Sequence, residues 1–346
     1  MVRELAAMLE ENNRVTILAA STDRMLRKRR HQALDHASYL LKALLYALTH
    51  LRETDAIISV DVPTGVRLVG FLPRLLSGNR IVNISWVLDM YSLQVSRLQA
   101  GLLPRNRVRQ FCDNLGLRAS TRIVALGQCM AESVRRESGK TSAVIPIWKE
   151  PSASGVNLRD RFGLRGDQFV LMYSGTAGPN HPMSALLEAV NSFENDDLVL
   201  LIAGRGSEVQ KAREIARLSG STNIRFLDPV EDHEVAALLA TADLHLAILD
   251  ERVTGTCVPS KAYSAMAAGK ACLFLGSTEC QAAIDIAAAG AGTTVGTADV
   301  QAIANELKMY VSTPGLAVFR GQNARKFISE QRSLFVSTRR WEDALG

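Results

Sequence analysis

The 346-residue sequence is poor in aromatic residues, which make up 5% of it, and it has no apolar run as long as a membrane span of roughly 18–20 residues. Without clustered aromatic residues or a recognisable nucleic-acid-binding module, we expect no nucleic-acid partner. The charged, amphipathic N-terminus does not resemble a signal peptide, so we expect a cytoplasmic protein.

The five cysteines lack the close pairing that metal ligands show. In a cytoplasmic protein this pattern is typical of reduced, mostly buried thiols, so the sequence predicts neither a zinc site nor a disulfide. The cysteines are Cys112, Cys129, Cys257, Cys272 and Cys280.

Apolar residues account for 47% of the chain and charged residues for 22%, as in a soluble globular protein. Because single cores stop growing near about 250–300 residues, this length predicts two domains. The charge is divided unevenly: residues 1–150 carry 22 Lys and Arg against 13 Asp and Glu, a net +9, and the remainder carries 18 against 22, a net −4. The basic half is suited to an anionic surface, and a phosphorylated lipid, a membrane and nucleic acid all qualify, because the sign of the charge alone does not choose among them.

Short β-branched runs alternate with helical stretches, which predicts βα units and parallel sheets. In the first half the expected helices are Ala37–Leu51 and Met130–Glu137, and the expected strands are Arg14–Ser21, Asp55–Pro63, Arg80–Val87 and Arg122–Gly127. A polar, turn-rich stretch, 148–158, precedes a second series: FVLMYSG, LVLLIAG, IRFLD, LHLAIL and ACLFLG. We therefore predict an α/β protein with two Rossmann-like, doubly wound domains.

The first domain begins unusually. A Rossmann-type half starts with a strand and a Gly-rich turn, but here MVRELAAMLEENN is already helical. The first strand is therefore missing, and either the true start lies upstream or the domain is degenerate. The basic segment Arg27–His31 and the amphipathic stretch that follows allow two readings: a helix resting on anionic membrane, or an ordinary helix covering the sheet behind a charged loop.

Three segments in the second half, FVLMYSGTAGPNHP, IAGRGSE and VPSKAYSAMAAGKACLFLG, resemble family 4 glycosyltransferases of the GT-B fold, particularly bacterial enzymes that build surface polysaccharides. The resemblance extends more weakly into the first half through WVLDMYSLQ, ALGQCMAESV and VIPIWKE. It implies two domains that face each other across a cleft. Residues 1–148 would form the acceptor-side domain, on which the C-terminal helix 328–346 could pack, and residues 160–327 the nucleotide-sugar-binding domain.

A diphosphate leaving group needs groups that stabilise negative charge, and a helix N-terminus with free N–H groups and a nearby cation supplies them. Pro259 and Ser260 are suited to the first turn of a helix, and Lys261 would place its ammonium beside the phosphates. The alternative is an ordinary surface lysine.

Two Gly-rich turns follow predicted strands. The first contains Gly175, Thr176 and Gly178, which either line the site or allow tight packing; the second is Gly204–Gly206, where Arg205 could supply another cation or be solvated. His181 would contact a phosphate or a sugar hydroxyl, or be structural. With the region Leu227–Val230, where the resembled family grips the base through the main chain, the donor-binding candidates are Gly175, Thr176, Gly204, Arg205, Val230, Val258, Pro259, Ser260, Lys261 and Ser264.

Two departures from the family's pattern stand out. Its pair of glutamates falls on Thr256 and Ser264, and its basic pair near the first Gly-rich loop is absent from TAGPNHP. The resemblance implies retention of anomeric configuration and no bound metal or other cofactor.

On the acceptor side, Asp89 directly follows a predicted strand, where the sites of α/β proteins collect. With His181 it is our candidate catalytic residue, because a carboxylate there could orient or deprotonate the acceptor hydroxyl. An N-capping role is the alternative, and Asp61 is a weaker candidate at a similar strand end.

The sequence therefore predicts a hexosyl- or N-acetylhexosaminyl-type transferase that uses a nucleotide-sugar donor, UDP-linked by the resemblance, and a polyprenyl-linked or oligosaccharide acceptor. The protein would be cytoplasmic or peripheral on the inner face of the membrane. A non-catalytic GT-B-like partner of an active transferase is the main alternative. An epimerase of similar fold is disfavoured, because it would need several carboxylates and histidines around the sugar.

Overall fold

The computed structural model describes residues 1–11, 13–19, 29–61, 63–98, 104–152, 155–193, 197–228 and 230–345. The chain forms two compact units. Unit 1 consists of Met1–Pro146, Gly255–Cys257 and Ser337–Gly346, and unit 2 of Ile147–Thr254 and Val258–Val336.

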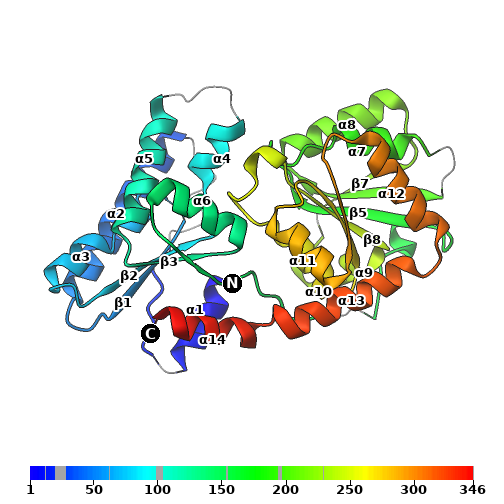
Figure 1. The fold of residues 1–346 in the computed structure, drawn as a ribbon. Coiled ribbons are helices and arrows are strands. Elements are labelled where there is room, and N and C mark those ends of the chain that lie inside the picture. The colour runs from blue at the N-terminus through cyan, green and yellow to red at the C-terminus, as the bar shows by residue number, and fades with distance from the viewer. Residues whose placement is uncertain are drawn as a thin grey trace. The chain divides into compact units, whose positions relative to one another are not determined.

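Unit 1 contains a four-stranded parallel sheet in the order β1-β2-β3-β4 (Figure 1). Its strands are β1 (Ala56–Val60), β2 (Val82–Val87), β3 (Arg122–Ala125) and β4 (Ala143–Val144). Its helices are α1 (Val2–Glu10), α2 (Arg29–Thr49), α3 (Phe71–Leu76), α4 (Tyr91–Leu98), α5 (Pro104–Ala119), α6 (Gln128–Ser138) and, from Ser337 on, α14 (Leu334–Leu345). The short 3₁₀ helix η2 (Val66–Leu68) follows β1.

Unit 2 contains a six-stranded parallel sheet in the order β10-β9-β8-β5-β6-β7 (Figure 1). Its strands are β5 (Phe169–Thr176), β6 (Leu198–Arg205), β7 (Ile224–Leu227), β8 (Leu244–Ile248), β9 (Ala271–Leu275) and β10 (Gly292–Val295). Its helices are α7 (Ser184–Asn191), α8 (Ser207–Ser219), α9 (Val235–Thr241), α10 (Ser260–Ala267), α11 (Gln281–Ala289), α12 (Val300–Ser312) and α13 (Leu316–Gln331).

The core of unit 2 lies on both faces of its sheet. Along β5, Leu171 and Tyr173 pack into one apolar cluster, and Val170 and Met172 pack into another. Strands that are covered on both faces become continuous apolar runs, which explains the FVLMY and LVLLI patterns. The predicted α/β architecture with two Rossmann-like sheets is confirmed.

The predicted strand Arg14–Ser21 is wrong for the residues that the structure describes. Residues 14–19 form no strand, and the side chains of Ile17 and Leu18 are exposed. The Tyr39 hydroxyl of α2 instead donates a hydrogen bond to the Leu18 carbonyl over 3.0 Å. A β-branched run becomes a strand only beside another strand, and the described part of the unit 1 sheet ends at β1.

The basic and amphipathic segment that suggested membrane contact is only partly visible. Arg27 and Lys28 lie outside the described residues, and α2 covers most of the rest. Ala43 and Ala47 of α2 are buried, but Leu41 and Leu45 are exposed. Among the described helices, none combines the length and hydropathy needed to cross a membrane.

The end of the chain completes the core of unit 1. Trp341 of α14 packs edge-to-face on Trp86 of β2, with ring centroids 5.0 Å apart, and both rings are fully buried. The Arg122 guanidinium also donates to the Ala344 carbonyl over 2.7 Å. An aromatic pair of this kind adds about 0.5–1.5 kcal/mol beyond the area that it buries.

We expect Trp341→Ala to lower the free energy of unfolding of unit 1 by about 3–5 kcal/mol, because it leaves a cavity against Trp86. Phe335→Ala is the control on the same helix: that side chain is exposed, and its loss should cost no more than about 0.5 kcal/mol. Urea unfolding followed by circular dichroism checks this. Equal unfolding midpoints for the two variants would contradict the packing role of Trp341.

Candidate functional site

The strand order of unit 2 reverses direction at β5. The chain proceeds from β5 outward through β6 and β7, and then returns to β8 on the other side of β5 before continuing to β9 and β10. In open α/β sheets, ligands bind outside the carboxyl ends of the strands at such a switch point. Gly175 and Thr176 end β5 there, and both are exposed.

In the second Gly-rich turn, glycine is required because two backbone segments approach closely. A Cβ atom on Gly204 would lie 2.1 Å from the Gly175 carbonyl oxygen, and one on Gly206 would lie 2.2 Å from that of Ala177. Gly206 also has φ +121°, a conformation that side chains disfavour. The Ala177 amide donates to the Arg205 carbonyl over 2.8 Å. The turns after β5 and β6 therefore form one interlocked layer of main chain.

Lys261 lies against this layer. Gly175 has φ +114°, and a Cβ atom there would approach the Lys261 Cε to 2.9 Å. The Lys261 ammonium lies 5.5 Å from the centroid of the Tyr173 ring, at cation–π distance. Lys261 is in the first turn of α10, whose N-cap Pro259 makes no side-chain cap. The structure thus brings together Gly175, Gly204 and Lys261, which are far apart in the sequence.

His181 belongs to the same region and is held by the first Gly-rich turn. Its Nδ1 accepts the Gly178 amide over 3.3 Å, and its own amide donates to the Gly178 carbonyl over 2.9 Å. Burial and, to a smaller extent, the positive charge of Lys261 together lower the pKa of His181 to about 4, against the opposing hydrogen bond from Gly178. The imidazole is therefore neutral at pH 7, and because Nδ1 accepts, Nε2 carries the proton.

The other donor-binding candidates differ in setting. The Ser264 hydroxyl donates to the Ser260 carbonyl of its own helix over 3.3 Å. Val230 is partly buried in an apolar cluster and Val258 is buried, whereas Arg205, Thr176 and Ser260 are exposed. Pro229, within the region expected to grip the base, lies outside the described residues.

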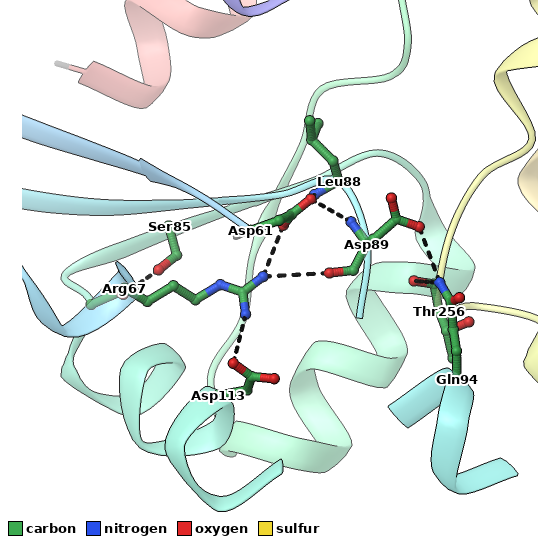
Figure 2. A network of polar contacts seen from close by, with 9 residues as sticks. Asp61, Arg67, Ser85, Leu88, Asp89, Gln94, Asp113 and Thr256 are labelled. Atoms are coloured by element: carbon green, nitrogen blue, oxygen red, sulfur yellow. Dashed lines mark hydrogen bonds and ion pairs between the residues drawn. The ribbon is translucent and has the colours of Figure 1, made fainter. Parts of the chain in front are cut away.

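In unit 1, Asp89 is exposed just after β2, in a turn fixed by its neighbours (Figure 2). The side-chain amide of Gln94 donates a hydrogen bond to the Asp89 carboxylate over 3.0 Å. The Met90 amide donates to the Thr256 carbonyl over 2.7 Å, and Asp89 forms an antiparallel bridge with Cys257. Thr256, at one expected glutamate position, is fully buried within unit 1.

From the sequence, Asp61 was only a weaker acceptor-side candidate, and Arg67 and Gln94 were not identified as site residues. Asp61 accepts the backbone N–H groups of Leu88 and Asp89 and pairs with the Arg67 guanidinium at 2.9 Å (Figure 2). No spacing signal links these residues, because they come from different elements. The Asp-Val-Pro strand end was the only clue.

Comparison with known proteins relates unit 2 to a family and defines the fold of the chain. Residues 168–312, which include the six strands of unit 2, match the family Glycosyl transferases group 1. The solved structures most relevant to the whole chain show that its fold is GT-B, with one Rossmann-like sheet in each unit.

Among particular proteins, the chain is similar to the putative colanic acid biosynthesis glycosyl transferase WcaI of Escherichia coli K12. They are 26% identical over 113 residues, which span 32% of this chain and 28% of the relative. Anabaena Alr3699/HepE, solved with UDP and glucose, superposes with a TM-score of 0.71 at 16% identity, over 89% of this chain and 81% of that one. WaaG, a glycosyltransferase involved in lipopolysaccharide biosynthesis, gives a TM-score of 0.68 at 15% identity, over 99% and 94%.

We expect His181 to titrate with a pKa of about 4, and Lys261→Met to raise that pKa by removing a neighbouring positive charge. Since an unfolded histidine titrates near 6.5, His181 contributes stability that is lost as the pH falls from about 6.5 toward 4. NMR titration of the imidazole protons measures both. A pKa near 6.5 that Lys261→Met leaves unchanged would show that the ring is not beside Lys261.

Proposed function

We propose that this protein is a glycosyltransferase. It would transfer a hexose or N-acetylhexosamine from a UDP-linked donor to a hydroxyl of a polyprenyl-linked or oligosaccharide acceptor, with retention of configuration, in cell-surface polysaccharide synthesis. The observation that carries the proposal is the convergence of Lys261, the start of α10 and the two Gly-rich turns at the switch point of unit 2. The first turn of a helix and a cation there suit a diphosphate.

The similar proteins support the same proposal. Unit 2 matches group 1 glycosyltransferases, and the structure of Alr3699/HepE holds UDP and glucose. WcaI is named for the biosynthesis of colanic acid and WaaG for that of lipopolysaccharide; both products are cell-surface polymers. As UDP leaves, its growing negative charge would be stabilised by Lys261 and the first turn of α10, so no metal or other cofactor is required.

Asp89 is the residue that we assign to the acceptor. Asp89 is exposed, and the side-chain amide of Gln94 donates a hydrogen bond to its carboxylate. An exposed carboxylate at the end of β2 can accept a hydrogen bond from an incoming hydroxyl and orient it. His181, neutral and with its proton on Nε2, would donate a hydrogen bond to the sugar or the phosphate.

A second candidate function is that of a non-catalytic partner of an active transferase. The main-chain contacts of Thr256 and the intrahelical bond of Ser264 favour it, because neither residue offers the carboxylate that would hold ribose hydroxyls. Binding of UDP without sugar transfer to any acceptor would support this alternative.

We expect calorimetric titration to show saturable binding of UDP, weakened about tenfold or more by Lys261→Met, because a hydrogen bond to a charged group is worth about 1.5–3 kcal/mol. Lys308→Met, on the exposed face of α12, should bind like the unchanged chain. GDP and ADP test the choice of base. Equal affinity in the two variants would refute the role of Lys261.

The acceptor proposal includes contact with anionic membrane through unit 1. Apolar side chains are exposed on two of its helices: Leu41 and Leu45 on α2, and Phe71, Leu75 and Leu76 on α3. The basic charge of residues 1–150 complements an anionic lipid surface.

We expect the chain to sediment with phosphatidylglycerol vesicles but not with phosphatidylcholine vesicles, and less so in high salt, which screens the charges. Replacing Leu75 and Leu76 together by Glu should abolish sedimentation. The matched double change of Val318 and Phe319 to Glu, at exposed positions of unit 2, should not. Equal sedimentation of the two double variants would exclude α3 as the contact.

A further inference from the structure

The turn that carries Asp89 contacts a buried ionic cluster formed by Asp61, Arg67 and Asp113 (Figure 2). Asp61 has a φ of +25°, which is unusual for a residue other than glycine and is best tolerated by Asp and Asn. In this conformation its carboxylate accepts the Leu88 amide at 2.9 Å and the Asp89 amide at 2.7 Å. Backbone strain is thus retained where the carboxylate reaches the turn.

Arg67 holds that carboxylate from the other side. Its Nη2 lies 2.9 Å from the Asp61 carboxylate and 3.5 Å from the Asp89 carbonyl, and its Nη1 lies 3.8 Å from Asp113 of α5. The Arg67 side chain is only 5% exposed, and its Nε has no hydrogen-bond partner among the described residues. Because a buried unsatisfied donor is costly, the position of Arg67 is set by the carboxylates that it bridges.

The packing of α5 is adapted to this arginine. A Cβ atom on Gly116 would lie 2.7 Å from the Arg67 Cβ, so only glycine lets α5 approach η2 this closely. Asp61 itself is 10% exposed, and its oxygens are occupied by Arg67 and the two amides. It is therefore too enclosed to meet an acceptor, whereas Asp89 is exposed.

We propose that Asp61 and Arg67 are positioning residues that lock the Leu88–Asp89 turn and so hold the Asp89 carboxylate ready for the acceptor. The part played by Asp89 rests on the proposed function; the locking of the turn does not. The pair acts through hydrogen bonds to the main chain, so it fixes the direction of the Asp89 side chain without touching the substrate.

The lock has a pH dependence. Burial, with a smaller contribution from the charge of Asp89, raises the pKa of Asp61 to about 7, against the opposing effects of Arg67 and the two amides. The charged groups around it are Arg67 on η2, Asp89 in the turn and, beyond Arg67, Asp113 on α5. Below neutral pH a proton on Asp61 removes a hydrogen-bond acceptor and loosens the turn. Turnover should therefore increase as the pH is raised, with an apparent pKa near 7.

The test uses Asp61→Asn in the full chain, because Asn keeps the backbone conformation and the volume but not the charge. We expect hydrogen exchange at the Leu88 and Asp89 amides to accelerate about tenfold or more, since two bonds to a carboxylate are weakened. With UDP-glucose as the probe and water as the hydroxyl that accepts the glucosyl group, kcat for UDP release should fall about tenfold to a hundredfold with KM unchanged, and the step near pH 7 should disappear. Asp89→Asn should give a similar loss of kcat without faster exchange.

Asp55→Asn is the matched control, because Asp55 precedes the same strand and pairs with Arg80 at the surface. It should change neither exchange nor kcat. Unchanged protection of the two amides in folded Asp61→Asn would overturn the lock. Faster exchange with normal kcat would overturn its link to catalysis. If the unchanged chain releases no UDP, the proposed function fails for this donor, and the exchange result still decides whether Asp61 holds the turn.

Discussion

The contact on which the proposed donor site depends is the approach of main chain to main chain at the ends of β5 and β6. Gly204 meets the Gly175 carbonyl, and Gly206 meets that of Ala177, at distances that exclude any side chain. Because Gly175 has no side chain, the stem of Lys261 can lie against it, with the ammonium near the Tyr173 ring at the switch point of the sheet. The position of the cation is therefore set by residues that have no side chain.

The two units use different physical means to prepare a site. In unit 2, glycine turns and the start of a helix offer main-chain N–H groups, which are rigid and suit an anion of any sugar nucleotide. In unit 1, a buried pair, Asp61 and Arg67, holds one exposed carboxylate by bonds to its own backbone. The first arrangement suits recognition of a diphosphate. The second suits orientation of a hydroxyl, for which direction matters more than charge.

Much of unit 2 could be predicted from sequence, because its strands are continuous apolar runs and its turns are marked by glycines. Lys261 and Gly175 were each predicted as donor-binding candidates, but their contact was not, since 86 positions separate them. The strand at Arg14–Ser21 was predicted wrongly because β propensity says nothing about whether a partner strand exists. Arg67 was missed because a single arginine in the short helix η2 carries no local signal; its role depends on Asp61 and Asp113, which lie outside that helix.

A crystal structure of the chain with UDP bound tests the central claim most directly. The diphosphate is predicted within hydrogen-bond distance of the Lys261 ammonium and of the N–H groups in the first turn of α10, beside Gly175. UDP bound elsewhere on unit 2, with Lys261 remote from the phosphates, would contradict the account of how this fold holds a donor.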